Sequence, residues 1–243
     1  MKRDDIYAVP RTPMTPFTFN AEVVDVFDDM ILRSVPGYQE ILSRQAEMAA
    51  RFYTDDSLIY DLGCSTGNFG AAFTRQMGDH AFHLISVDSS LPMMICCRSR
   101  LCTHTADERF SFVCSALEHL TVRNASVVVL NFTLQFVPIE IRAEILQTVA
   151  GGLRPGGILL FSEKTTHPDS EIAKHQVDTY YRFKADNGYS ELEISQKREA
   201  LEDILIPESP AVHIKRLSEA GFGAVDIWYK WFNFMSLICR KIG

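Results

Sequence analysis

SLIYDLGCSTGNFG, residues 57–70, joins a short apolar run to a glycine-containing loop and then to a helical pattern. Residues 57–60 have the character of a buried strand, and residues 68–77 continue at helical spacing. Gly63 and Gly67 permit backbone angles and close approach that a Cβ would obstruct. Because the first amides of a helix lack partners within it, they face a ligand held by the loop. The stretch therefore predicts a strand, a loop and a helix that together bind a nucleotide cofactor.

The spacing of the loop residues narrows the class of cofactor. Gly63 and Gly67 are separated by three residues, so the dinucleotide pattern G-x-G-x-x-G is not present, and neither is a P-loop. The pattern Asp61-x-Gly63-x-x-x-Gly67 resembles motif I of Rossmann-like S-adenosylmethionine enzymes, in which the backbone holds the amino-acid half of the ligand. A tight turn without a ligand is the alternative interpretation of the loop taken alone.

Asp88 ends a second apolar segment, AFHLISVDSS, 25 residues after Gly63. A carboxylate at the carboxyl end of a parallel strand can accept hydrogen bonds from both ribose hydroxyls of a nucleoside. The alternative is that Asp88 caps the helix that begins near Leu91, although Ser89 or Ser90 would fill that role equally well. The pairing of Asp88 with the glycine loop favours the ribose role.

Composition restricts the partners that we expect. The 243 residues are 47% hydrophobic and carry a net charge of −7. Because this charge is negative, we expect no general electrostatic attraction to nucleic acid or to an anionic membrane. The opening MKRDDIYAVPRTP lacks an apolar signal region, and no apolar run is long enough to span a bilayer. We expect a cytoplasmic protein with no membrane partner and no direct nucleic-acid binding.

The cysteines do not have the spacing of metal ligands. No C-x-x-C pair and no neighbouring histidine cluster accompanies them, so we expect reduced packing residues and no metal site. Cys64 lies inside the glycine loop, where its small size explains its presence better than nucleophilic catalysis does. The six are Cys64, Cys96, Cys97, Cys102, Cys114 and Cys239.

Apolar runs alternate with helical segments through most of the chain, which predicts βαβ units and a parallel sheet. LRPGG at 153–157 is expected to end a helix and turn the chain into the fifth strand. The final run VDIWYKWFNFMSLICRKI alternates around Asn233 as a hairpin would. Residues 1–18 are expected to be irregular. The predicted helices are 20–33, 38–52 and 211–220, and the predicted strands are 57–61, 82–87, 109–114, 125–131 and 156–161.

We predict a single α/β domain over residues 1–243. It carries an N-terminal helical extension at about 1–55. A polar, helix-prone insertion at about 164–205 interrupts the alternation of strands and helices.

Three further residues are candidates for the site, each with a structural alternative. Asn131 ends the fourth predicted strand, where its amide could hold a ligand or cap the next turn. Tyr38 follows a Pro-Gly turn and begins a helix, and by itself it is better explained as a core residue. Arg198 lies on a charged helix, where a lone arginine usually faces solvent. In that helix, Ser190 and Glu193 form a predicted capping box, and Glu193 and Lys197 a predicted i,i+4 pair.

Three blocks of sequence together resemble the carboxy-S-adenosyl-L-methionine synthase family of bacterial tRNA wobble-uridine modification. They are FDDMILRSVPGY at 27–38, ASVVVLNFTLQFV at 125–137 and FKADNGYSELEISQKR at 183–198. The resemblance covers nearly the whole chain. It implies a Rossmann-like methyltransferase fold with a mostly parallel seven-stranded sheet, an antiparallel C-terminal strand, N-terminal helices and a helical insertion.

The resemblance also implies a reaction other than methylation. The family joins a carboxyl group taken from prephenate to the methyl carbon of S-adenosyl-L-methionine, its other substrate. The products are carboxy-S-adenosyl-L-methionine, phenylpyruvate and water. It further implies a homodimer whose product is used by a downstream tRNA carboxymethyltransferase.

Carried over position by position, the resemblance assigns S-adenosylmethionine contacts and one carboxylate contact. Arg198 matches the arginine that binds the new carboxylate, for which a guanidinium fork is well suited. The assigned S-adenosylmethionine contacts are Tyr38, Gly63, Cys64, Ser65, Asp88, Ser89, Leu117 and Asn131.

Ala116 departs from the family pattern, which commonly has an aspartate at this position near the adenine. The adenine amino group then lacks that acceptor, and Ser115, Glu118, a backbone carbonyl or water would have to replace it. The acid that helps hydroxide leave prephenate is unassigned, since Arg33, Tyr189 and His175 are candidates by residue type alone.

The sequence is compatible with two other functions. One is an ordinary small-molecule methyltransferase that uses the same loop and Asp88. The other is a non-catalytic S-adenosylmethionine-binding accessory protein, in which Arg198 would have no purpose.

Overall fold

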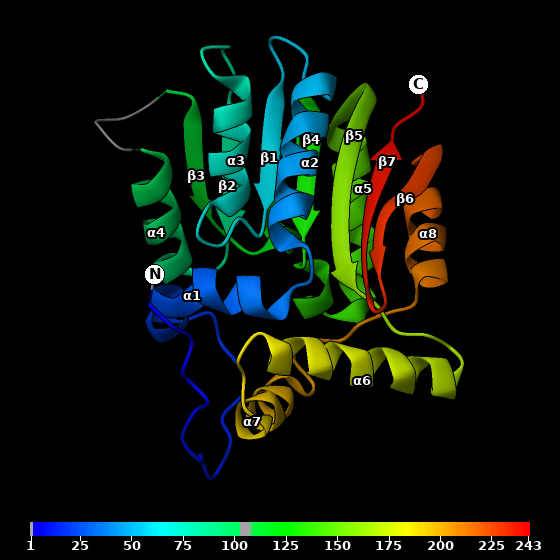
Figure 1. The fold of residues 1–243 in the computed structure, drawn as a ribbon. Helices are drawn as coiled ribbons and strands as arrows, with labels where there is room; N and C mark the ends of the chain where they lie inside the picture. The colour runs from blue at the N-terminus through cyan, green and yellow to red at the C-terminus, as the bar shows by residue number, and fades with distance from the viewer. Residues whose placement is uncertain (1, 103–107) are drawn as a thin grey trace.

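The computed structural model describes residues 2–102 and 108–243, and these residues form a sheet covered by helices (Figure 1). Met1, part of the segment expected to be irregular, lies outside them. The strand order in the described sheet is β3-β2-β1-β4-β5-β7-β6. All neighbouring pairs among the first five strands are parallel, whereas β7 is antiparallel to both β5 and β6. The strands are β1 (Leu58–Leu62), β2 (Leu84–Asp88), β3 (Phe110–Cys114), β4 (Ala125–Asn131), β5 (Leu153–Lys164), β6 (Ala224–Trp231) and β7 (Phe234–Arg240). The α/β class and the antiparallel C-terminal strand are confirmed.

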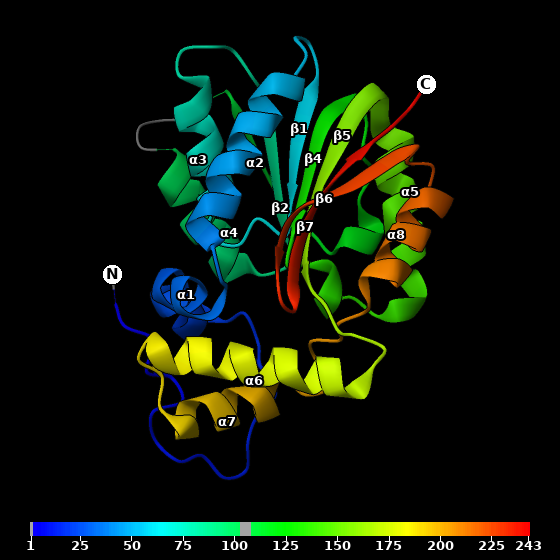
Figure 2. The same ribbon diagram turned by 45° about the vertical axis from the view of Figure 1, so that its right-hand side comes forward.

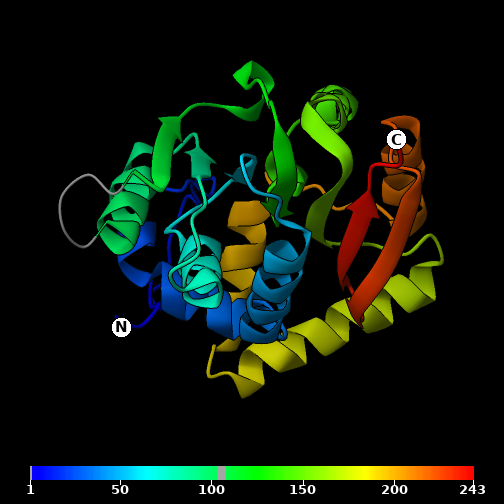
Figure 3. The same ribbon diagram turned by 90° about the horizontal axis from the view of Figure 1, so that it is seen from above.

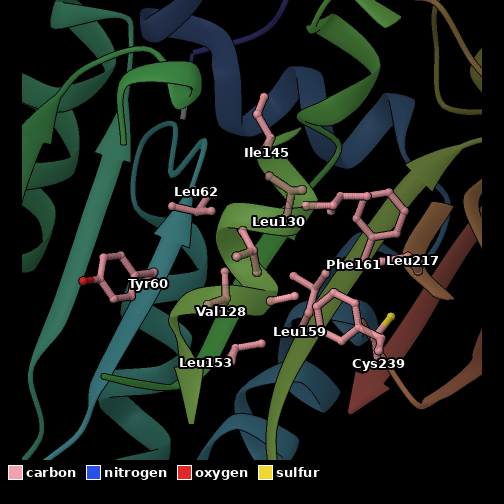
Figure 4. Close-up of a cluster of buried hydrophobic side chains, with 14 of the residues drawn as sticks. Tyr60, Leu62, Val128, Leu130, Ile145, Leu153, Leu159, Phe161, Leu217 and Cys239 are labelled. Atoms are coloured by element: carbon pink, nitrogen blue, oxygen red, sulfur yellow. The ribbon is translucent and has the colours of Figure 1, made fainter. Parts of the chain in front are cut away.

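Helices cover both faces of the sheet (Figure 3). On one face lie α2 (Tyr38–Phe52), α3 (Asn68–Met77) and α4 (Leu91–Leu101); on the other lie α5 (Arg142–Gly152) and α8 (Pro210–Glu219). Side chains of a strand alternate between the faces, so each face has its own core. Val127 and Val129 of β4 pack with α2 and α3, whereas Val128 and Leu130 pack with α5 and α8. Figure 4 shows the second of these cores around Leu130 and Phe161.

The LRPGG segment differs from its prediction. The preceding helix ends at Gly152 as expected, but β5 begins at Leu153 and not at residue 156. Leu153 pairs with Ala125, and the register then shifts before Val127 pairs with Ile158. Gly156 has φ +83° within this irregular stretch, a conformation that favours glycine. The Pro-Gly sequence therefore makes a bulge inside the strand.

A third group of helices lies across the carboxyl ends of the parallel strands (Figures 1 and 2). These helices are α1 (Ala21–Ser34), α6 (Ser170–Asp186) and α7 (Glu191–Leu201). The N-terminal segment is tied to α7, because Phe17 N donates to Ala200 O at 2.8 Å and Arg11 N donates to Gln196 Oε1 at 2.6 Å. Three short 3-10 turns, Leu117–His119, Leu134–Phe136 and Ile139–Ile141, complete the described elements.

Residues far apart in sequence thus meet at one edge of the sheet. Ligands of open α/β sheets bind beyond the carboxyl ends of the strands, and that edge is the one covered by α1, α6 and α7. In the described part of the chain, no helix has both the length and the apolar character needed to cross a bilayer.

Candidate functional site

A cavity of about 770 Å³ lies between the carboxyl ends of the strands and the helices that cover them. Its volume is in the upper part of the roughly 300–1,000 Å³ range of small-molecule sites. All nine residues predicted for the site line it: Tyr38, Gly63, Cys64, Ser65, Asp88, Ser89, Leu117, Asn131 and Arg198. The structure therefore brings the predicted residues together around one space.

The glycine loop is held against the end of β2. The amides of Gly63 and Cys64 both donate to Val87 O, at 2.8 and 3.0 Å. Gly63 has φ +75°, and a Cβ there would overlap the Thr133 side chain. Gly67 has φ +83° and precedes α3, whose N-terminus has no side-chain cap. The first amides of α3 are consequently free of a capping side chain.

Asp88 fastens this loop and keeps capacity for a ligand. Its Oδ2 accepts from Ser65 N at 2.9 Å, and its Oδ1 accepts from Ser90 N at 2.8 Å. Since an ionised carboxylate has about four acceptor positions, roughly two remain for hydroxyl groups. The helix-cap alternative is excluded, because Ser90 is the N-cap of α4 and its Oγ accepts from Met93 N.

Asn131 is oriented by Gln45 of α2. Gln45 Nε2 donates to Asn131 Oδ1 at 2.8 Å, and Asn131 Nδ2 donates to Gln45 Oε1 at 2.7 Å. The Asn131 side chain therefore does not cap the following turn; instead Thr133 Oγ1 donates to its backbone carbonyl. Tyr38 begins α2, lines the cavity and receives a hydrogen bond from Asn68 Nδ2 at 3.4 Å, so its position is at the cavity wall.

Asp61 lines the cavity and was not among the predicted site residues, although it is the acidic residue of the loop pattern. Its side chain is 2% exposed, and its Oδ2 has no hydrogen-bond partner among the described residues. Burial, with a smaller effect of Asp88, raises the pKa of this carboxyl to about 8. A buried acid without a partner at the loop suits a cationic group of a ligand.

Cys64 has the character of a packing residue. Its Sγ lies 3.5 Å from the sulfur of Met94, and a hydrogen bond with Cys97 together with burial raises the thiol pKa. Because the thiolate is the nucleophilic form, this environment disfavours covalent catalysis by Cys64.

Ala116 and Leu117 lie where the chain passes the cavity after β3. Ser115 and Glu118 line the same wall, so both proposed substitutes for an adenine acceptor are near. Ser115 Oγ donates to Ala116 O at 3.1 Å, an arrangement that leaves the lone pairs of Ser115 Oγ available to accept a hydrogen bond.

The insertion supplies a basic and aromatic side of the cavity that sequence reasoning missed. Lys164 at the end of β5 and Tyr180, Tyr181 and Lys184 of α6 all line it. Helical periodicity gave no signal for this, because it does not tell which face of α6 meets the sheet. Arg198 of α7 also lines the cavity; its side chain is exposed and has no hydrogen-bond or ion-pair partner in the described residues.

Of two expectations for the insertion, one is confirmed and one is corrected. The capping box of Ser190 and Glu193 is present, but Lys197 pairs with Asp4 at 3.4 Å and not with Glu193. The N-terminal segment brings Asp4 beneath α7, and this tertiary contact replaces the local one.

The three residues considered as acids lie outside the described cavity lining. Tyr189 donates to Asp4, Arg33 stacks over the Tyr189 ring at 3.8 Å, and the His175 ring lies 5.9 Å from that of Phe232. These groups have structural contacts instead. Within the described residues, no cluster of three or more His, Cys, Asp or Glu side chains is arranged to hold a metal ion.

Comparisons with known proteins show which family this chain belongs to. A family model described as a methyltransferase domain matches residues 59–157. The carboxy-S-adenosyl-L-methionine synthase of Desulforapulum autotrophicum is 49% identical, over 99% of this chain and 98% of the relative. The protein of the same name from Haemophilus ducreyi is 44% identical, over 99% of each chain.

Solved structures share the fold at much lower identity. An O-methyltransferase family protein from Burkholderia thailandensis has a TM-score of 0.62 at 19% identity, over 96% of this chain and 66% of that chain. A putative methyltransferase from Bacillus halodurans has a TM-score of 0.59 at 12% identity, over 83% of this chain and 99% of that chain.

Proposed function

Since the chain belongs to the carboxy-S-adenosyl-L-methionine synthase family, we propose that its cavity binds S-adenosyl-L-methionine beside prephenate and transfers a carboxyl group between them. The chain is an enzyme that uses S-adenosylmethionine. The products of the proposed reaction are carboxy-S-adenosyl-L-methionine, phenylpyruvate and water.

The reaction balances without an oxidant or a metal ion. The sulfonium acidifies its methyl group, and loss of one proton leaves an ylide. Prephenate loses carbon dioxide and hydroxide as its ring becomes aromatic, which gives phenylpyruvate. The ylide carbon forms a bond to the carbon dioxide, while the proton and the hydroxide form water.

The cavity suits such a sequence of steps. The ylide and carbon dioxide must meet before water reaches either of them, so the site must exclude water and hold both substrates close. The aromatic side chains that line the cavity are apolar and help to exclude water. The aromatic residues are Phe17, Phe19, Phe27, Tyr38, Phe69, Phe132, Phe136, Tyr180, Tyr181 and Phe234.

In this proposal the loop side of the cavity holds S-adenosylmethionine. The backbone of Gly63, Cys64 and Ser65 holds the amino-acid half, Asp88 and Ser89 hold the ribose, and Leu117 contacts the adenine. Tyr38 and Asn131 complete this part of the site.

The observation that carries the proposal is the position of Arg198. It lines the cavity that the glycine loop lines, and its guanidinium has no partner among the described residues. A free guanidinium suits the carboxylate that forms on the methyl carbon, whereas an ordinary methyltransferase or a simple binding protein has no use for it.

Arg198→Ala tests the proposal. We expect product formation from S-adenosylmethionine and prephenate to fall by a factor of at least about 10, since a hydrogen bond between charged groups contributes about 1.5–3 kcal/mol. S-adenosylmethionine binding should change little. Arg182→Ala is the matched control, because Arg182 is an exposed arginine of α6 outside the cavity lining. Methyl transfer to an acceptor without prephenate would contradict the proposal.

The biological setting forms a further part of the proposal. We place the enzyme in the cytoplasm as a homodimer, where a downstream tRNA carboxymethyltransferase uses its product to modify the wobble uridine. The net charge of −7 supports supply of a small molecule over direct binding of tRNA.

A further inference from the structure

Lys164, Lys184 and Lys197 line one side of the cavity, and they alternate with the rings of Tyr180, which also lines it, and of Tyr189, which lies behind the lining. The Lys164 ammonium lies 4.8 Å from the centre of the Tyr180 ring, and that of Lys184 lies 5.3 Å from the same centre. Lys184 and Lys197 flank the Tyr189 ring at 5.7 and 5.5 Å. The row therefore brings three positive charges together from β5, α6 and α7.

One of these charges is neutralised within the protein and two are not. Lys197 pairs with Asp4 at 3.4 Å and also donates to Ser34 Oγ. Across the described residues, the side-chain nitrogens of Lys164 and Lys184 have neither an ion pair nor a hydrogen bond, although Lys184 is 4% exposed. Removing an ammonium from water without an anionic partner is costly, so the two lysines are incomplete without a ligand.

The row lies apart from the residues proposed to hold S-adenosylmethionine. Apart from Tyr38, which begins α2, those residues end or follow β1, β2, β3 and β4. Lys164, in contrast, ends β5, and Lys184 lies on α6, which crosses beneath that part of the sheet (Figure 1). The two lysines nevertheless line the same cavity as the glycine loop. They are placed for a second, anionic ligand beside the first.

Resting on the proposed function, we propose that Lys164 and Lys184 bind the carboxylate that prephenate keeps, the one on its pyruvyl side chain. Prephenate carries two carboxylates, of which one moves to the methyl carbon and the other remains in phenylpyruvate. Arg198 receives the first, so the unpaired lysines serve the second. The Tyr180 ring between them supports both ammonium groups by cation–π contact.

The pKa values of the two lysines agree with this assignment. Burial lowers the pKa of Lys164 to about 8, and burial with the charges of Lys197 and Lys164 lowers that of Lys184 to about 7. An anion bound between the two lysines would raise both pKa values, so the lysines would take up protons on binding near neutral pH. The negative charge of Asp4 also raises the pKa of Lys184, but by less than burial lowers it. The other charged groups that line the cavity are Asp61, Asp88, Glu118, Lys197, Arg198 and Glu202.

The test measures prephenate binding by calorimetry in the presence of saturating S-adenosylhomocysteine, which lacks the methyl group and prevents turnover. Lys164→Met and Lys184→Met keep the apolar stem and remove the charge, and Lys184→Arg keeps the charge. Lys174→Met is the control, since Lys174 is exposed on α6 and outside the cavity lining.

We expect each methionine variant to bind prephenate at least about tenfold more weakly, with S-adenosylhomocysteine affinity within about twofold of the parent. Lys184→Arg and Lys174→Met should keep prephenate affinity within about threefold. The ligand-free methionine variants should melt no lower than the parent, because they lose an unpaired buried charge.

Two results would overturn the assignment. One is prephenate affinity that is unchanged in both methionine variants, and the other is an equal loss of S-adenosylhomocysteine affinity, which would place the lysines on the first ligand. Failure of the proposed function is distinguishable from these results, because the parent protein would then bind S-adenosylhomocysteine but not prephenate; that result would overturn the assignment as well.

Discussion

Gln45 and Asn131 form a reciprocal pair of side-chain amides, in which each donates to the oxygen of the other at 2.7–2.8 Å. Gln45 also donates to Ser162 Oγ at 3.0 Å and is fully buried behind the cavity wall. Asn131 therefore presents to the cavity one amide hydrogen and one acceptor position whose directions Gln45 sets.

Replacement of Gln45 by leucine should weaken S-adenosylmethionine binding without removing any residue that lines the cavity. Loss of the pair leaves the Asn131 amide unsatisfied, which costs about 1–3 kcal/mol of stability and lets the side chain turn. We expect about fivefold to tenfold weaker binding by calorimetry. Gln39→Leu, at an exposed position of the same helix, should have neither effect. Unchanged affinity in Gln45→Leu would show that Asn131 needs no positioning.

Asp61→Asn should have opposite effects on the stability of the ligand-free protein and on its affinity for S-adenosylmethionine. The raised pKa means that the folded carboxyl keeps its proton up to about pH 8, whereas the unfolded carboxyl loses it near 3.8. Ligand-free stability therefore falls as pH rises through that window, and the asparagine variant should be the more stable protein above about pH 8.

S-adenosylmethionine brings a positive charge to Asp61 and should release its proton on binding at neutral pH. Calorimetry in two buffers of different ionisation enthalpy measures this release. We expect Asp61→Asn to abolish it and to bind at least about tenfold more weakly. Asp226→Asn, on the exposed side of β6, is the control. Proton release that persists in Asp61→Asn would assign the release to another group.

Ala116→Asp should strengthen adenine binding. An acceptor near the adenine amino group adds one ordinary hydrogen bond, worth about 1 kcal/mol, or about a fivefold gain in affinity for S-adenosylhomocysteine. The inosine analogue of the same ligand has an oxygen in place of that amino group and should gain nothing. Equal gains for both ligands would mean that the aspartate does not act on the amino group.

His213 gives a prediction about acid stability, away from the cavity. It is 1% exposed, neither ring nitrogen has a hydrogen-bond partner among the described residues, and burial lowers its pKa from 6.5 to about 4. Between these values the unfolded chain binds the extra proton, so this group costs stability as pH falls from about 6.5 to 4.

His213→Phe should remove that cost and fill the space beside Phe161. Urea unfolding should show a gain at about pH 5 that exceeds the gain at about pH 7.5 by about 2 kcal/mol. An equal change at both pH values would mean that His213 does not titrate on unfolding in this range.

The part of the site that follows the strands was predictable because its signals are local. The glycine loop, Asp88 and Asn131 each occupy the end of an apolar run, and parallel strands place such ends at one edge. The helical insertion gave no comparable signal. Its charged helices fit a solvated surface equally well, and nothing in their spacing showed that Lys184 faces inward, toward Lys164 at the end of β5.

The pairing of Lys197 shows the same limit. Glu193 is the partner that helical spacing predicts, but Asp4 lies 193 residues away in the sequence and takes its place. Only the packing of the N-terminal segment against α7 brings Asp4 there, and a contact of that range has no local pattern. The family resemblance gave Arg198 its predicted role, whereas the residues around it required the structure.

Transfer of the carboxyl group itself is tested most directly with prephenate labelled with ¹³C in its ring carboxyl group. The protein is incubated with unlabelled S-adenosylmethionine, and the released ligands are analysed by mass spectrometry. We expect carboxy-S-adenosyl-L-methionine that carries the label in its new carboxyl group, together with unlabelled phenylpyruvate, and no product when prephenate is omitted. Recovery of only unchanged S-adenosylmethionine or S-adenosylhomocysteine, or a carboxylated product without the label, would contradict it.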